Sequence, residues 1–133
     1  MFLKFKKTSE NKKVTNATPN TVDGIAFKSK LESYCYTKLR ANGLIADYEK
    51  ITFTILDSFQ YLTEKIRPIT YTPDFVGDTF IIECKGFAND AFPLRWKLFK
   101  HFLWRNKLCY DLYVPRTKKD VDVTIENIVK NGK

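Results

Sequence analysis

The chain has 133 residues, of which 44% are hydrophobic, 15% aromatic and 29% charged. This length predicts a single domain that can bury a core, and the composition excludes an intrinsically disordered chain. The formal net charge of +8 and the pI near 9.4 favour a polyanionic partner, with nucleic acid as the first expectation. An anionic membrane surface would attract the same charge, and a role in solubility alone would also account for it.

Residues 1–20 are predicted to be a flexible basic arm, and residues 21–133 to be the folded domain. The arm carries five lysines, separated mainly by Asn, Thr and Ser. Such a segment can follow a phosphate backbone and release counterions, or it can be a solvated tail.

The first helix is predicted to begin near residue 27 and to end before Gly43. Apolar residues recur at helical spacing between these limits, and a glycine after an asparagine is a typical stop. Residues 29–32, Ser-Lys-Leu-Glu, have the form of a capping box, which would by itself explain Glu32.

Residues 44–56 are predicted to supply one or two half-buried strands. Ile51, Phe53 and Ile55 alternate there with polar residues, as one face of a strand requires. Residues 57–67 are more polar and aromatic, and we expect them to form a loop or a strand extension near the functional residues.

The clearest pattern is a predicted hairpin of residues 71–75 and 81–86. The connecting residues, Val-Gly-Asp-Thr, suit a tight turn. Alternation places the side chains of the second strand on two faces, the first with Ile81, Glu83 and Lys85 and the second with Phe80, Ile82 and Cys84. We expect the second face to enter the core, and the first to present Glu83 and Lys85 close to Asp74.

A second helix is predicted from residue 91 or 92, with Pro93 in its first turn. Residues 108–114 are predicted to be the last strand, and a short helix follows Pro115. This order of elements indicates the α/β fold class, with a single compact domain in which helices flank a central mixed β-sheet.

The cysteines, Cys35, Cys84 and Cys109, are odd in number and scattered. Neither a disulfide framework nor a zinc site fits this pattern, so we expect three buried free thiols in a reducing compartment. No apolar run approaches the roughly 18 residues of a membrane span, and the basic start lacks the apolar region of a signal peptide. The expected location is cytoplasmic, with no membrane partner. A glycine-rich phosphate loop and internal repeats are also absent from the sequence, which counts against kinases, ATPases and dinucleotide-binding proteins.

Two carboxylates beside a lysine at the end of a hairpin have a specific chemical use. Mg²⁺ prefers oxygen ligands and is held by one or two carboxylates together with phosphate oxygens. A metal bound by Asp74 and Glu83 would activate a water, and Lys85 would orient that water or neutralise developing charge. The alternative is an ordinary polar hairpin on a solvated sheet face.

Pro73-Asp74 followed by Glu83-Cys84-Lys85 resembles the signature of the PD-(D/E)xK nuclease superfamily. Three runs are similar to those of small phage and prophage nuclease-like proteins: Asp-Gly-Ile-x-Phe-x-Ser-Lys at residues 23–30, Tyr-x-Pro-Asp-Phe at 71–75 and Glu-x-Lys-Gly at 83–86. The order of these parts is also similar, more distantly, to the phage endonuclease I family that resolves Holliday junctions. The resemblance covers roughly residues 21–104.

This resemblance implies a restriction-endonuclease-like fold and a cofactor, Mg²⁺, for which Mn²⁺ would substitute. It implies that an acidic residue of the first helix, here Glu32, completes the metal site with Asp74 and Glu83, and that the carbonyl of Cys84 is a further ligand. Cations near the hairpin would then contact the DNA backbone, and the candidates are Arg95, Lys97, Lys100 and Lys30.

The function expected from these observations is metal-dependent hydrolysis of phosphodiester bonds by a DNA endonuclease, encoded by a phage or prophage and acting in the host cell. Branched DNA is the leading substrate, and a junction-resolving enzyme would act as a homodimer with two active sites. Three alternatives are a general or nicking endonuclease, an inactive DNA-binding module with the nuclease fold, and an interaction protein that inhibits a host factor.

Overall fold

A four-stranded mixed sheet lies at the centre of the fold, with the strand order β10-β9-β8-β3. The computed structural model describes residues 18–86 and 91–132, so most of the predicted basic arm lies outside the described residues. Strand β8 is antiparallel to both its neighbours, whereas β10 is parallel to β9. The strands span Ala46–Tyr48 (β3), Phe75–Gly77 (β8), Phe80–Ile82 (β9) and Asp111–Tyr113 (β10).

The β8–β9 hairpin confirms the predicted turn. Phe75 pairs with Ile82 and Val76 with Ile81. A Cβ atom on Gly77 would lie 2.3 Å from the ring of Phe80, so only glycine allows this ring to pack against the turn.

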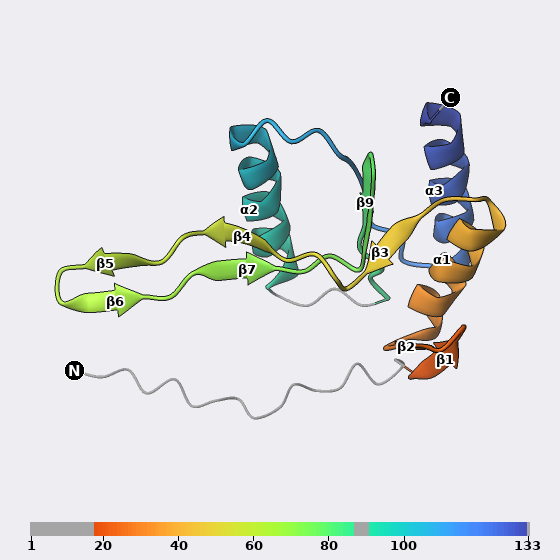
Figure 1. Cartoon of the computed structure of the whole chain (residues 1–133), viewed down its shortest axis with the longest axis horizontal. Helices are drawn as coiled ribbons and strands as arrows, with labels where there is room; N and C mark the ends of the chain where they lie inside the picture. Colours follow the sequence, from red (N-terminus) through yellow and green to blue (C-terminus); the bar gives the residue numbers. More distant parts are fainter. Residues whose placement is uncertain (1–17, 87–90, 133) are drawn as a thin grey trace.

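Helices cover both faces of this sheet. Helices α1 (Lys30–Ala41) and α3 (Lys118–Asn131) pack together on one side, and α2 (Phe92–Arg105) lies on the other (Figure 1). Phe80 and Ile82 enter the core beneath α1 and α3, whereas Ile81 packs with Phe99 of α2 and is 0% exposed. The expectation of a single buried face is therefore wrong, because α2 buries the second face as well.

The ends of the helices follow from local sequence. Helix α1 begins at the N-cap Ser29 and ends in a Schellman motif, in which Gly43 has a φ of 67° and the N–H of Leu44 donates to the carbonyl of Leu39. The apolar residue predicted as its start, Phe27, instead belongs to β2 (Ile25–Phe27), which pairs with β1 (Asn20–Val22) through a tight turn.

Helix α2 begins where it was predicted and also ends in a Schellman motif. Lys107 has a φ of 55°, and the N–H of Leu108 donates to the carbonyl of Leu103. This cap uses residues that were expected to open the last strand, so β10 covers only residues 111–113. Cys109 lies in the resulting loop and is exposed, which makes the expectation of three buried thiols wrong. The other two, Cys35 and Cys84, are buried as expected.

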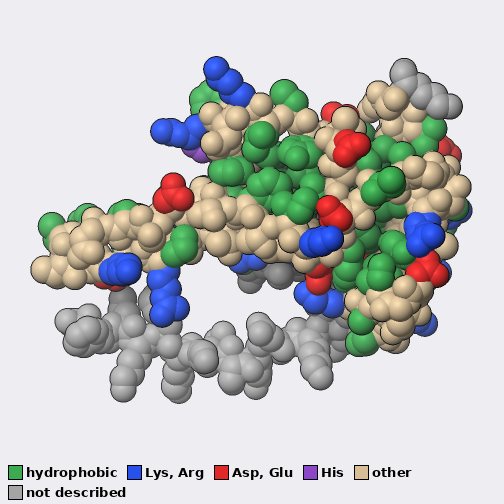
Figure 2. Space-filling model, viewed as in Figure 1, with side chains coloured by type: hydrophobic (Ala, Val, Ile, Leu, Met, Phe, Trp, Pro, Cys, Tyr) green, Lys and Arg blue, Asp and Glu red, His purple; other side chains and the backbone are tan. Residues whose placement is uncertain are grey.

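A two-stranded extension leaves the central sheet, and we call residues 53–71 the β-arm. Strand β4 (Phe53–Leu56) pairs with β7 (Ile69–Tyr71), and β5 (Phe59–Tyr61) pairs with β6 (Glu64–Ile66) beyond them. The β-arm projects from the body of the molecule (Figures 1 and 2). Residues 57–67 were expected near the functional residues but form its outer end, because consecutive antiparallel pairings carry the ribbon outward. Within the described ranges, no helix has the length and hydropathy to cross a membrane.

Candidate active site

Asp74 is held rigidly at the start of β8. Its side chain is 7% exposed, and its Oδ2 accepts a hydrogen bond of 2.8 Å from the backbone N–H of Cys84 on the adjoining strand. Its backbone carbonyl accepts another, of 2.9 Å, from the N–H of Glu49. The hairpin therefore fixes both the main chain and the carboxylate of this residue.

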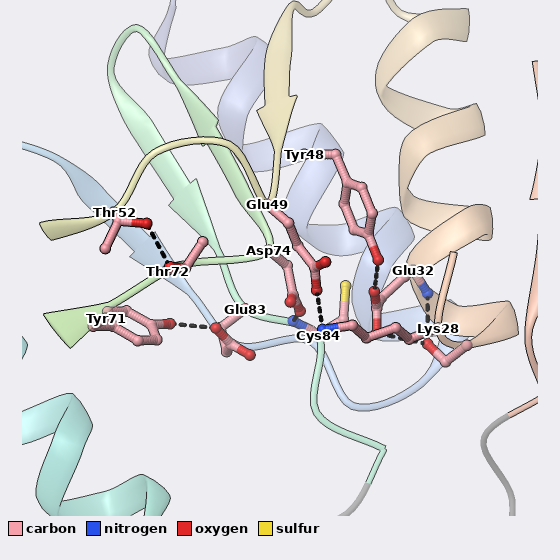
Figure 3. Close-up of polar contacts among 11 residues, drawn as sticks. Lys28, Glu32, Tyr48, Glu49, Thr52, Tyr71, Thr72, Asp74, Glu83 and Cys84 are labelled. Carbon is pink, nitrogen blue, oxygen red and sulfur yellow. Dashed lines mark hydrogen bonds and ion pairs between the residues drawn. The ribbon is translucent and has the colours of Figure 1, made fainter. Parts of the chain in front are cut away.

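Three carboxylates from separate elements converge at this point. Oxygen atoms of Glu32, Glu49 and Asp74 all lie within 4.8 Å of one another. Glu32 comes from α1, Glu49 follows β3, and Asp74 precedes β8 (Figure 3). Such a group of oxygen donors could hold a hard divalent cation.

Glu32 takes part in both the helix cap and the acidic group. Its backbone N–H donates to Ser29 Oγ at 3.1 Å, and the Ser29 hydroxyl donates to Glu32 Oε1 at 3.1 Å. The hydroxyl of Tyr48 donates to the other carboxylate oxygen (Figure 3). The two roles weighed from the sequence do not exclude each other, since the cap uses mainly the backbone and leaves the carboxylate among the other acids.

Glu49 was missed by the sequence reasoning. It has a φ of 46°, a left-handed conformation that is uncommon for a glutamate, and its carboxylate lies 2.8 Å from Lys28 Nζ. The only signal was an acidic residue at the end of a short alternating run, and the stronger alternation of residues 51–55 masked it. Lys28, which also joins the site, lies one residue before the capping serine and was not singled out.

Glu83 lies on the other side of Asp74 from Glu32 and Glu49. It is 8% exposed, and its Oε1 accepts a hydrogen bond from the hydroxyl of Tyr71 (Figure 3). A hydrogen bond from the carboxyl group of Asp74 also reaches Glu83. Asp74 therefore joins the three-carboxylate group to the glutamate of the predicted motif.

Burial concentrates negative charge in this site. It raises the pKa of Asp74, and the charges of Glu83 and Glu32 raise this pKa further. Burial also raises the pKa of Glu83 and of Glu32, although hydrogen bonds from Tyr71 and Tyr48 respectively oppose the effect. Carboxylates crowded in this way are stabilised by a cation, so the donor set fits the Mg²⁺ expected from the sequence.

Two lysines border the acidic residues from opposite sides. The ion pair with Glu49 raises the pKa of Lys28, and the charges of Glu32 and Asp74 act in the same direction. Lys85 lies with its Nζ 4.6 Å from the ring centroid of Phe92, and its charge lowers the pKa of Glu83. The lysine predicted for catalysis is thus close enough to Glu83 to affect its ionisation.

The cations predicted to contact DNA are all exposed, on two helices. Arg95, Lys97 and Lys100 lie on α2, and Lys30 is the first residue of α1. The charge of Arg95 acts on Tyr71, the partner of Glu83, which places the start of α2 beside the site. The carbonyl of Cys84 belongs to the segment whose N–H holds Asp74.

A family model described as "Protein of unknown function (DUF1064)" matches residues 11–119. This range covers most of the chain, and the chain belongs to that family. The matched range contains the four acidic residues and both lysines of the site. No curated protein and no solved structure matches the chain.

Proposed function

We propose that this member of the DUF1064 family is a metal-dependent DNA endonuclease of the PD-(D/E)xK superfamily, hydrolysing phosphodiester bonds. The observation that carries the proposal is the placement of Asp74, held by the strand of Glu83 and Lys85 and joined by the carboxylates of Glu32 and Glu49. The formal charge of +8 on the whole chain supports a polyanionic substrate.

The acidic residues would hold Mg²⁺, or Mn²⁺ in its place. Asp74, Glu32 and Glu49 offer mutually close oxygens, and Glu83 approaches from the other side of Asp74. When bound, the metal supplies a lowered pKa for water and a charge that stabilises the reacting phosphate.

The surrounding residues orient these carboxylates. Tyr48 and Tyr71 donate hydrogen bonds to Glu32 and Glu83, and burial raises the pKa of both phenols, so they remain donors. Lys85 would orient the attacking water or neutralise charge on the phosphate, and its stacking on Phe92 limits its motion. Arg95, Lys97 and Lys100 would contact the DNA backbone from α2.

Branched DNA is the proposed substrate, and a homodimer is the proposed form, because paired cuts at a junction need two active sites. Both proposals rest on the motif resemblance. The test is a cleavage assay on a labelled four-way junction and on a linear duplex of matched sequence, with Mg²⁺ or with a chelator. Preferential, metal-dependent cutting of the junction is expected. Equal cutting of both substrates would indicate a general endonuclease, and binding without cutting would indicate a DNA-binding module.

Asp74→Asn keeps the shape of the side chain and removes its charge. We expect cleavage to fall by about 1,000-fold or more while DNA binding is retained. Asp78→Asn is the matched control, since Asp78 is exposed in the turn of the same hairpin. Full activity of Asp74→Asn would overturn the proposed function.

A further inference from the structure

The β-arm is joined at its base to the candidate active site. Its two strands connect Glu49 to Asp74, and the hydroxyls of Thr52 and Thr72 form a hydrogen bond of 2.7 Å across the base (Figure 3). Tyr71, the last residue of the arm, holds Glu83 and packs on Phe99 of α2. The direction of the arm is therefore fixed relative to the acidic residues.

The outer hairpin of the arm has two different faces. Phe59 pairs with Ile66 on one face, which also carries Tyr61, and the two aromatic side chains are 47% and 61% exposed. Gln60 pairs with Lys65 on the other face. Figure 2 shows hydrophobic side chains along one edge of the arm and basic side chains along the opposite edge.

The tip of the arm carries an exposed leucine in a strained conformation. Because Tyr61 pairs with Glu64, the turn consists of Leu62 and Thr63. Leu62 is 83% exposed and has a φ of 51°, a conformation that favours glycine in such turns. A large apolar side chain is thus held outward at the tip in spite of its backbone strain.

We propose that the β-arm is a ribbon that binds double-stranded DNA beside the bond to be cut, with Gln60, Lys65 and Arg67 contacting the duplex. This inference rests on the proposed function and names the part of its substrate that lies outside the active site. Arg67 follows Lys65 by two residues along the strand, so alternation directs it to the same side.

The dimensions of the arm suit a duplex. The major groove of B-DNA admits a two-stranded β-ribbon. At about 3.3 Å per residue, the strands from Phe53 to Tyr61 extend roughly 25 Å, somewhat less than one turn of B-DNA. The arm would therefore contact the same duplex within one turn of the active site.

Charge favours DNA over a second copy of this chain as the occupant of the basic side. The whole chain carries a formal charge of +8, so two copies repel each other, whereas a polyanion is attracted. The base of the arm adjoins acidic residues that could hold a metal, and a phosphodiester bound there would bring its duplex against the arm.

The test compares two variants that each lose two positive charges. The arm variant is Gln60→Ala/Lys65→Ala/Arg67→Ala, and the control is Lys119→Ala/Lys130→Ala on α3. Binding of both to a duplex of about 30 base pairs is measured over a range of salt concentrations in the Asp74→Asn background, which prevents cleavage. The arm variant is expected to bind at least about tenfold more weakly and to lose about 2 from the salt slope, one for each phosphate contact. The control is expected to keep most of the affinity and slope.

Two results would overturn the inference. Unchanged duplex affinity and salt slope in the arm variant would show that the arm does not touch the DNA. A wild-type dimer that becomes monomeric in the arm variant, with DNA affinity unchanged, would assign the arm to a second copy. Neither result depends on cleavage, whereas metal-dependent cutting by the wild-type protein tests the proposed function separately.

Discussion

The active-site group and the β-arm adjoin each other but place their residues in opposite ways. The site buries carboxylates, and every buried side-chain nitrogen or oxygen in the described part of the chain has a hydrogen-bond partner. The arm exposes Phe59, Tyr61 and Leu62 to solvent. Charges inside and apolar groups outside both reverse the usual distribution, and such reversals concentrate where a protein binds something else.

The comparison can be sharpened most strongly by removing one phenylalanine ring from each region. Phe75 is 0% exposed beside Asp74, so Phe75→Ala should lower the free energy of unfolding by about 3–5 kcal/mol. Phe59→Ala removes the same atoms from the exposed arm and should cost less than about 1 kcal/mol. Urea denaturation measures both, and similar losses would mean that the arm is packed against another surface.

A second difference is the response of the site to pH in the absence of metal. Burial raises the pKa of Asp74, Glu83 and Glu32 in the folded chain. The folded state then binds more protons than the unfolded state, so this contribution to stability is fully present below the unfolded value of about 4 and is lost as pH rises through the folded values. Each unit by which a pKa is raised corresponds to about 1.4 kcal/mol.

The melting temperature of the metal-free protein should therefore fall as pH rises from 5 to 8, in so far as these groups determine it. Mg²⁺ should raise it most at the upper end of this range, where the carboxylates are charged. Thermal unfolding followed by circular dichroism measures both effects. Asp74→Asn should flatten the pH dependence, and Asp78→Asn should not. A metal-induced increase of the same size at pH 5 and pH 8 would contradict this account of the site.

A smaller effect is expected from the lysine that pairs with the acidic group. The side chain of Lys28 is largely exposed, so Lys28→Met should lower stability by less than about 1 kcal/mol. Its ammonium lies where it competes with a metal cation, so the variant should bind Mn²⁺ several-fold more tightly in calorimetric titration. Lys50→Met is the control, because Lys50 forms an exposed ion pair with Asp47. Weaker binding of Mn²⁺ by Lys28→Met would show that Lys28 supports the metal site.

The smallest predicted effect lies at the tip of the arm. Leu62→Gly should relieve the left-handed strain and stabilise the hairpin by less than about 1 kcal/mol, since glycine also loses more backbone entropy on folding. Hydrogen exchange of the β5 and β6 amides is the most direct measurement. Faster exchange in this variant would indicate that Leu62 makes stabilising contacts.

Local sequence signals predicted the parts of the fold that depend on short-range structure. The β8–β9 turn, the start of α2 and the end of α1 all carry glycine, proline or capping residues in standard positions. Asp74 is positioned by its own hairpin, so its burial between neighbouring strands could be anticipated. Its partner Glu32 could be proposed only through the motif, because helix packing brings it to the sheet.

Other parts depend on long-range pairing and could not be predicted. Glu49 reaches the site because β3 pairs with β8 and because its backbone is left-handed, and neither feature has a sequence signature here. The outer hairpin of the arm turns through Leu62 and Thr63, which are not typical turn residues, so the region was expected to be a loop. In both places the missing information was tertiary.

The hydrogen bond from the N–H of Glu49 to the carbonyl of Asp74 has a consequence for how such proteins diversify. It brings together the two ends of residues 50–73, so the intervening segment is an insertion whose boundaries are already closed. The entropy of closing a loop grows slowly with its length, so this segment can lengthen, shorten or change sequence at little thermodynamic expense. Recognition can therefore evolve in this one insertion while the acidic residues keep their positions.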